Sequence, residues 1–253
     1  MIEVKNLKYK YSSVDKEWVL NNLSFNLNCG EKVALMGANG SGKTTLVRCL
    51  NGLLQIHEGD IKVNGMNLKD SENLYKVRRN VGMVFQNPDN QIVSTTVERE
   101  IAFGLENLGL PYQEIKEKVE KTLIEFDLEK YRIVSPHLLS GGEKQRLAFA
   151  SIWIMDPKYL ILDETTSMLD YNLKKQLFRF LDHAVNEKKM GVLLVTQFSE
   201  EVLYFDRLIV LDKGEIVIDD KPEELFYNER SLHNVGIQRP AELELTNYIK
   251  RKL

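Results

Sequence analysis

The chain has 253 residues, a formal net charge of −3 and a sequence pI near 5.9, so it is long enough to bury a sizeable core. This charge gives no electrostatic reason to expect nucleic acid as the main partner. The two cysteines form no C-x-x-C pair and the four histidines lack metal-ligand spacing, so neither a disulfide framework nor a zinc site is expected. We find no signal-peptide pattern and no apolar run of membrane-spanning length, and we expect a protein of the reducing cytosol.

The N-terminal part of the chain has the alternating apolar pattern of strands that face a core on one side. This pattern runs over residues 2–11 and 23–27, and a short strand is also expected within the glycine-flanked residues 59–65. The apolar run at 32–36 is expected to be a buried strand. We therefore predict a β-rich N-terminal segment that is antiparallel in character.

A glycine-rich loop, G-A-N-G-S-G-K-T at residues 37–44, joins that buried strand to a helix expected to start near Lys43. Its glycines let successive backbone N–H groups turn toward phosphate oxygens, and the helix N-terminus adds the positive end of its dipole. In loops of this pattern the lysine reaches the β- and γ-phosphates and the threonine hydroxyl holds Mg²⁺. The sequence therefore predicts a site for a nucleoside triphosphate, with a chance glycine turn as the less favoured alternative. The residues expected to bind the nucleotide are Gly37, Asn39, Gly40, Ser41, Gly42, Lys43, Thr44 and Thr45.

The sequence changes character after a buried strand expected at residues 80–85. Residues 95–108 and 111–126 have a helical pattern, and a further helix is expected to begin near residue 140. We interpret roughly residues 88–156 as a helical insertion.

Strands and helices alternate again in the rest of the chain. Strands are expected at 159–162, 192–195, 207–211 and 215–218, and helices at 173–189 and 199–205. A parallel sheet with crossover helices is the expected core. Residues 229–253 are expected to form a short tail that ends in a helix over 241–251.

The apolar strand expected at 159–162 ends in two carboxylates, Asp163 and Glu164. An aspartate at a strand tip can bind Mg²⁺, directly or through water, and the adjacent glutamate can face a water aligned on the γ-phosphate. A simple acidic loop is the alternative, but the phosphate loop upstream favours the catalytic interpretation.

The segment L-S-G-G-E-K-Q-R at residues 139–146 stands at the start of an expected helix. It resembles the signature motif of ATP-binding-cassette (ABC) ATPases, usually written L-S-G-G-Q. The resemblance implies that a second subunit presents this helix N-terminus to the γ-phosphate held by the first. The signature residues that it implies are Ser140, Gly141, Gly142 and Glu143.

The resemblance covers about residues 1–228 and implies an α/β fold. The implied cassette has a RecA-like parallel sheet core, an N-terminal antiparallel β subdomain and an α-helical subdomain inserted at about 88–156. Residues 229–253 then form a short C-terminal helical extension.

Further positions match the family pattern and are assigned by that resemblance. Gln86 matches the loop glutamine that senses the γ-phosphate, and Asp170 matches the loop that crosses the dimer interface. Tyr11 stands where the family has an aromatic residue that stacks on adenine, with a plain core residue as the alternative. The implied Mg²⁺ ligands are Thr44, Gln86 and Asp163.

One position departs from the family pattern. Gln197 stands where the family normally has a histidine that contacts the γ-phosphate. Glutamine can donate a hydrogen bond but cannot carry a positive charge near pH 7. Because Glu164 is kept, we expect an active site that turns over more slowly than one with histidine. The implied catalytic residues are Glu164, Gln197 and Gln86.

Several stretches resemble the ATPases of energy-coupling factor importers in particular. They are residues 86–91, 96–104, 163–170 and 235–240. This resemblance implies an ATP-hydrolysing subunit that uses ATP and Mg²⁺ at the cytoplasmic face of the cell membrane, in an importer of vitamins or of cobalt or nickel ions. Its implied partners are a second cassette, favoured as a non-identical one, a transmembrane coupling protein and a substrate-capture membrane subunit.

Other functions stay open at this point. One is the ATPase of a conventional ABC importer, and another is a low-activity nucleotide-binding cassette whose partner carries most hydrolysis. A soluble cassette that acts on ribosomes or DNA is less favoured, because the chain has neither a second cassette nor a long coiled-coil insertion.

Overall fold

The computed structural model describes residues 1–12, 14, 16–167, 169–227 and 237–240. The strands are β1 (Ile2–Tyr9), β2 (Leu20–Leu27), β3 (Lys32–Gly37), β4 (Glu58–Val63), β5 (Met66–Asn67), β6 (Val81–Val84), β7 (Tyr159–Asp163), β8 (Gly191–Val195), β9 (Arg207–Asp212) and β10 (Glu215–Asp220). The α-helices are α1 (Lys43–Leu50), α2 (Leu74–Asn80), α3 (Val97–Asn107), α4 (Tyr112–Glu125), α5 (Gly141–Trp153), α6 (Tyr171–Asn186), α7 (Ser199–Val202) and α8 (Pro222–Tyr227). Short 3-10 helices lie at Ser71–Asn73, Pro88–Asn90, Glu129–Tyr131 and Pro136–Leu138.

The strands of the described residues form two sheets. The six-stranded sheet has the order β10-β9-β3-β8-β7-β6, and the four-stranded sheet has the order β2-β1-β4-β5. Strands β6, β7, β8, β3 and β9 pair in parallel, whereas β10 pairs antiparallel with β9. The small sheet is antiparallel throughout. Both the expected parallel core and the antiparallel N-terminal segment are therefore confirmed.

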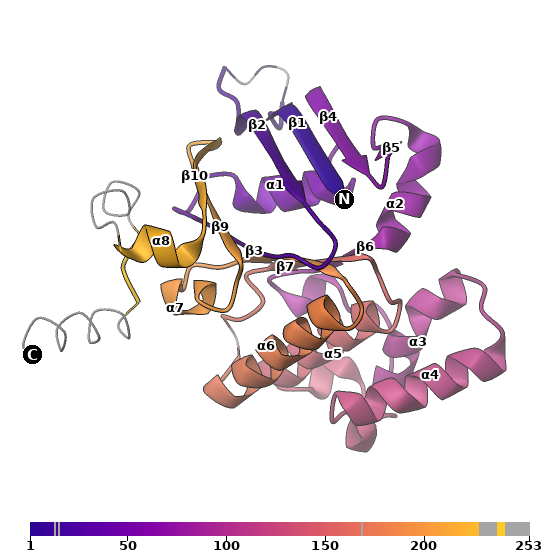
Figure 1. Ribbon diagram of the computed structural model, residues 1–253. Coiled ribbons are helices and arrows are strands. Elements are labelled where there is room, and N and C mark those ends of the chain that lie inside the picture. The colour runs from indigo at the N-terminus through magenta and orange to yellow at the C-terminus, as the bar shows by residue number, and fades with distance from the viewer. Residues whose placement is uncertain (13, 15, 168, 228–236, 241–253) are drawn as a thin grey trace, which may run out of the picture.

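Alternation along β3 divides the buried side chains into two clusters. Val33 and Leu35 pack with the small sheet and α1, whereas Ala34 and Met36 pack with α3, α4, α5 and α6. Successive side chains of a strand point to opposite faces of the sheet, so a strand buried on both faces connects the two layers. Figure 1 shows the small sheet and α1 on one side of the large sheet and helices α3 to α6 on the other.

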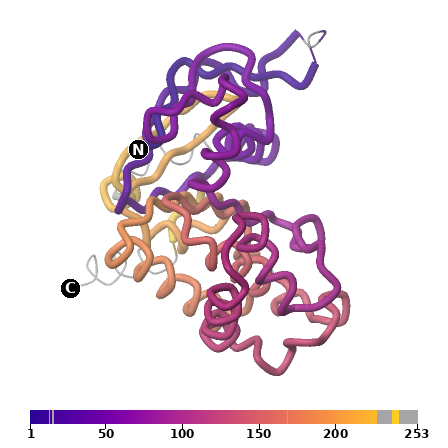
Figure 2. Tube along the Cα trace, turned by 90° about the vertical axis from the view of Figure 1, so that its right-hand side faces the viewer, coloured from indigo at the N-terminus to yellow at the C-terminus, as the bar shows by residue number. Residues whose placement is uncertain are grey.

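The chain between β6 and β7 is helical, as expected. Helix α3 begins after Thr96, whose hydroxyl accepts the backbone N–H of Arg99, and α4 begins after Pro111. In Figure 2 this magenta segment forms a lobe at the opposite end of the molecule from the indigo small sheet. No helix in the described ranges combines the length and the apolar character that crossing a bilayer requires.

Some elements differ from the sequence-based expectations. Helix α2 has no counterpart among the elements predicted from the sequence, and it includes Asn80, which the sequence pattern places in the strand that follows. This helix buries only Val77, so it lacks the apolar stripe that a sequence pattern reveals. Strand β1 ends at Tyr9, and the expected helix at 241–251 lies outside the described residues.

Gly191, the first residue of β8, has no room for a side chain. A Cβ atom there would lie 2.5 Å from the carbonyl oxygen of Asn28 and 2.8 Å from Cδ1 of Tyr159. We expect Gly191→Ala to lower the free energy of unfolding by about 1–3 kcal/mol, because the backbone must shift to admit the methyl group. Urea unfolding measures this change, and an unchanged midpoint would contradict the tight fit.

Candidate functional site

The loop between β3 and α1 has the backbone conformation of an anion-binding nest. Gly37, Gly40 and Gly42 have φ values of 152°, 79° and 105°. A Cβ atom at Gly37 would lie 2.1 Å from the carbonyl oxygen of Leu211, so this position requires glycine. Beside Gly40 no described atom lies within 4 Å of such a position, so this part of the loop faces open space. The N–H of Ser41 donates to the carbonyl oxygen of Ala38 at 3.1 Å, so the open space beside Gly40 is the part of the loop that an anion can approach.

Lys43 lies over this loop and is 5% exposed. Its Nζ donates to the carbonyl oxygens of Gly37 at 2.8 Å and Ala38 at 3.1 Å. Burial lowers the pKa of Lys43, while nearby carboxylates oppose this shift. The buried Oγ of Ser41 has no hydrogen-bond partner within the described part of the chain. A desolvated ammonium group and an unpaired hydroxyl in one glycine loop fit a triphosphate.

Thr44 and Asp163 meet where β7 ends. Oγ1 of Thr44 donates to Oδ1 of Asp163 at 3.3 Å. Burial raises the pKa of Asp163 to about 6, the charge of Glu164 adds to the rise, and the Thr44 hydrogen bond opposes it. Hydroxyl and carboxylate oxygens are ligands that Mg²⁺ prefers. Among the described residues no cluster of three or more His, Cys, Asp or Glu could hold a metal ion.

Glu164 lies between two glutamines that come from neighbouring strand ends. Nε2 of Gln86 donates to the Glu164 carboxylate at 2.9 Å, and Nε2 of Gln197 lies 3.0 Å from each of its oxygens. Gln197 also lies 3.2 Å from Oδ1 of Asn39 in the phosphate loop. The backbone of Glu164 has a φ of 51°, a left-handed conformation that is uncommon outside glycine and clusters at active sites. The structure thus brings the three expected catalytic residues together beside the phosphate loop.

Helix α5 begins with a capping box formed by two signature residues. The Ser140 hydroxyl accepts the backbone N–H of Glu143, and the Glu143 carboxylate accepts both the N–H and the hydroxyl of Ser140, each at 2.8 Å. The Tyr131 hydroxyl also donates to Glu143. The hydrogen bonds from Tyr131 and then Ser140 lower the pKa of Glu143 to about 2. The hydroxyl proton of Ser140 is therefore directed to Glu143 in this structure.

The signature residues and Asp170 share a polar cavity of about 430 Å³. Ser140, Gly142, Glu143 and Asp170 line it, and the Asp170 carboxylate caps α6 by accepting the N–H of Leu173 at 2.9 Å. No phosphate-loop residue is among the described residues that line this cavity. Within one chain the signature residues therefore form a group separate from the phosphate loop.

Tyr11 is a surface residue at the edge of the phosphate-loop helix. Its side chain is 57% exposed, and its hydroxyl lies 2.9 Å from Oγ1 of Thr45. The ring also makes an edge contact with Tyr9 at a centroid distance of 5.2 Å. The alternative that Tyr11 is a core residue is therefore wrong.

The order of these motifs is that of a known family, and residues 20–167 match the family model described as ABC transporter. The chain belongs to the ABC transporter family. It is an ABC-type ATPase that binds ATP. The cassette fold expected from the resemblance, with a parallel core, an antiparallel β layer and helices, is confirmed.

Curated relatives are similar to this cassette over nearly its whole length. The energy-coupling factor transporter ATP-binding protein EcfA1 of Clostridium novyi is 42% identical and covers 97% of this chain and 88% of the relative. The EcfA1 protein of Ligilactobacillus salivarius is also 42% identical, over 100% of this chain and 89% of the relative.

Solved structures agree with this assignment. The cbiO1 protein of Clostridium perfringens, described as part of the ABC transporter complex cbiONQ, has a TM-score of 0.81 at 31% identity and covers 97% of this chain and 98% of its own. The dimeric cassette MJ0796, bound to ADP and phosphate, has a TM-score of 0.81 at 27% identity and covers 88% of this chain and 99% of its own.

Sequence reasoning missed a buried carboxylate that supports the candidate hydrolysis site. Glu201 is 2% exposed and accepts the hydroxyls of Thr166 at 2.9 Å and Thr196 at 2.6 Å. It also pairs with Nζ of Lys174 at 2.8 Å. The two threonines belong to the loops after β7 and β8, which carry two of the three residues expected to act in hydrolysis. Glu201 therefore connects these loops to each other and to α6.

We expect Glu201→Ala to lower the free energy of unfolding by about 1–3 kcal/mol, because it removes the buried acceptor of the Thr166 and Thr196 hydroxyls and the carboxylate partner of Lys174. ATP hydrolysis should fall as well, since both loops lose their common anchor. Urea unfolding and a steady-state ATPase assay measure the two effects.

The matched control is Glu200→Ala, which changes the exposed neighbour on the same helix. It should change the free energy of unfolding by less than about 0.5 kcal/mol and leave the rate of ATP hydrolysis unchanged. Equal effects of the two substitutions would contradict the role assigned to Glu201.

Proposed function

We propose that this chain is one ATP-hydrolysing cassette of an energy-coupling factor importer. In this proposal it works at the cytoplasmic face of the membrane as half of a cassette dimer, on a transmembrane coupling protein with a separate substrate-capture subunit. The names of the EcfA1 relatives and of the cobalt-type neighbour cbiO1 support this branch of the family. The cargo is a vitamin or a cobalt or nickel ion. The observation that carries the hydrolytic role is the position of Glu164 between two glutamine amides and beside the phosphate loop.

The proposed division of the chain follows from the motifs. Residues 1–228 form the cassette domain, with a helical subdomain at about 88–156. Residues 229–253 form a short extension, most of which lies outside the described residues.

The phosphate loop is proposed to hold the triphosphate through backbone N–H groups and Lys43. The ammonium group, now paired with two loop carbonyls, has its positive charge available for the β- and γ-phosphates. The exposed ring of Tyr11, whose hydroxyl meets Thr45, is a suitable platform for the adenine base. The remaining phosphate contacts are assigned to Gly37, Asn39, Gly40, Ser41, Gly42 and Thr44.

Thr44 and Asp163 would hold Mg²⁺ together with Gln86. The ion would neutralise charge on the phosphates when bound. The other ligands in this proposal are phosphate oxygens and water, which Mg²⁺ usually retains.

Glu164 is proposed to accept the proton of the attacking water, or at least to orient that water. Water oxygen bonds to the γ-phosphorus, the bond to ADP breaks, and the proton passes to the Glu164 carboxylate. Gln86 and Gln197 fix the orientation of this carboxylate through their amide donors. A general base in such a position contributes about 100-fold to 10,000-fold to a rate.

The second half of each site is proposed to come from the partner cassette. The signature residues Ser140, Gly141, Gly142 and Glu143 and the interface residue Asp170 sit apart from this chain's own phosphate loop, as a shared site requires. We propose a heterodimer, because a partner with histidine at the position of Gln197 would complement this chain. A low-activity cassette with a more active partner is the second candidate, and Gln197 is the observation that favours it.

The test of this function is purification of the tagged chain from native membranes in mild detergent, with an untagged strain as control. Mass spectrometry should identify a second cassette, a coupling membrane protein and at least one small membrane subunit. Recovery of two ordinary permease subunits would contradict the energy-coupling factor assignment and favour a conventional importer. Recovery of soluble partners alone would contradict both.

We expect Gln197→His to raise the single-turnover rate of the site built on this chain by about tenfold, which corresponds to about 1.4 kcal/mol. The amide of Gln197 is a neutral donor, whereas an imidazole can carry a positive charge near the γ-phosphate. Rapid-quench measurement with the partner's catalytic glutamate disabled isolates this site. An equal rate in both proteins, at equal ATP affinity, would exclude the effect.

We expect Glu143→Gln to weaken the start of α5 by about 0.5–2 kcal/mol at pH 7, because it weakens a capping box. The pKa of Glu143 is depressed, so its stabilising effect is present above the pKa of the unfolded chain and is lost as the pH falls toward about 2. The stability difference between the two proteins should therefore narrow below about pH 4.5. Urea unfolding from pH 7 to pH 3.5 tests this, and a constant difference would contradict it.

A further inference from the structure

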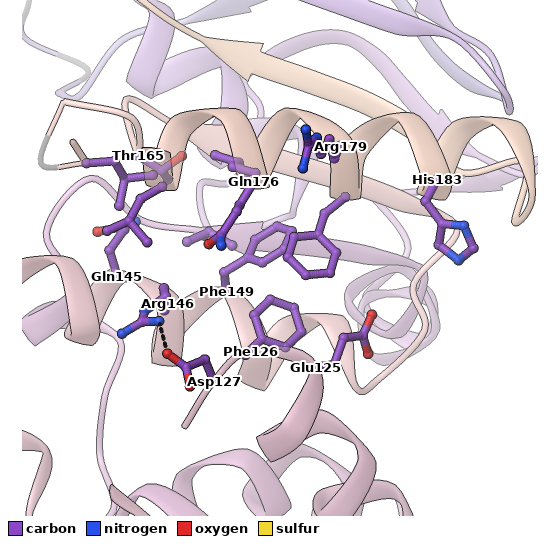
Figure 3. Close-up of a pocket in the computed structure, with 15 residues that line it drawn as sticks. Glu125, Phe126, Asp127, Gln145, Arg146, Phe149, Thr165, Gln176, Arg179 and His183 are labelled. Atoms are coloured by element: carbon purple, nitrogen blue, oxygen red, sulfur yellow. Dashed lines mark hydrogen bonds and ion pairs between the residues drawn. The ribbon is translucent and has the colours of Figure 1, made fainter. Parts of the chain in front are cut away.

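A second cavity, of about 370 Å³, lies between α6 and the helices α4 and α5. Its lining includes three aromatic side chains, Phe126, Phe149 and Phe180. The rings of Phe126 and Phe180 are stacked with a centroid distance of 4.9 Å. Figure 3 shows the helix that carries Gln176, Arg179 and His183 running above Phe126 and Phe149, which line the cavity. This size and lining are those of a pocket for a small, largely apolar molecule.

One end of this cavity has buried polar atoms without partners. Gln145 and Thr165 are each 2% exposed and both line the cavity. Both amide atoms of Gln145 and the hydroxyl of Thr165 lack a hydrogen-bond partner within the described residues. Figure 3 shows these two side chains side by side at the same end. Such unpaired buried groups are rare in folded proteins, and here they face a space that another molecule can enter.

The charged residues around the cavity balance each other. Arg146 and Arg179 are matched in number by Glu125 and Asp127, and His183 also lines the cavity. Nη1 of Arg146 donates to Asp127 at 3.3 Å, whereas its buried Nε has no partner within the described residues. A ligand with a net charge would therefore meet no excess of the opposite sign. The polar end is supplied by an amide, which offers one acceptor and one donor group next to each other.

We propose that this cavity binds a small, neutral, planar heteroaromatic molecule through a lactam edge that pairs with the amide of Gln145. A lactam presents an N–H beside a carbonyl, so it can donate to Oε1 and accept from Nε2 at once. Its ring packs against the phenylalanines. The bound molecule also touches Thr165, which follows the hydrolytic Glu164, and the helix that carries the signature residues. This site stands on the cavity alone and does not depend on the proposed importer.

The test is a titration of the purified full-length chain with quinazolin-4(3H)-one, followed by calorimetry or ligand-observed NMR. We expect saturable binding of one molecule per chain with a Kd of about 1 mM or tighter. The 3-methyl derivative has the same rings but no lactam N–H, and it should bind at least about tenfold more weakly.

The variant Gln145→Met keeps the length of the side chain and removes both unpaired amide atoms. We expect it to raise the melting temperature and to weaken binding of quinazolin-4(3H)-one at least about tenfold. A rise in stability with a loss of binding separates the proposed contact from misfolding. The matched control is Gln113→Met on α4, an exposed glutamine outside the cavity, which should leave binding unchanged.

Three results would overturn the proposal. One is the absence of saturable binding of quinazolin-4(3H)-one to the unchanged protein, which would mean that the cavity holds only water. Another is equal binding by Gln145→Met. The third is equal affinity for the two quinazolinones, because the lactam edge would then play no part.

Discussion

Parallel pairing of the central strands is the constraint on which the proposed hydrolysis site depends. Leu35 and Asp163 are both in register with Val195, and Val84 is in register with Leu162. The loops that leave these strands therefore open at one edge of the sheet, which is where open α/β sheets bind ligands. A shift of one residue would move a strand end by about 3.3 Å and turn its side chains to the other face. The register thus sets the distances within the site.

Buried polar contacts keep the loops at that edge in place. Glu201 joins the loops after β7 and β8. Glu164, the first residue of the loop after β7, is held in a left-handed backbone conformation. Such a conformation costs about 1–3 kcal/mol and persists where the surroundings determine it. The surrounding core thus offsets the cost of this backbone conformation. It holds the Glu164 carboxylate beside the phosphate loop, in contact with two amide donors.

Much of this site could be predicted because its signals are local. The phosphate loop and the acidic pair after β7 each lie within eight consecutive residues, and strand alternation separates the two faces of the core. The role of Glu201 could not be predicted, since its partners lie 5, 27 and 35 residues away and only the fold brings them together. The Tyr131 contact to Glu143 and the unpaired amide of Gln145 could not be predicted for the same reason. Helix α2 could not be predicted because it lacks an apolar stripe.

The most direct test of this account compares ATP binding and hydrolysis by the unchanged protein and by Glu164→Gln in the same assembled complex. A glutamine of the same shape can still contact its neighbours but cannot accept a proton from water. We expect the rate of hydrolysis to fall at least about 100-fold while the affinity for ATP stays the same. Hydrolysis at the original rate, or a loss of ATP binding as large as the loss of hydrolysis, would contradict the role of Glu164.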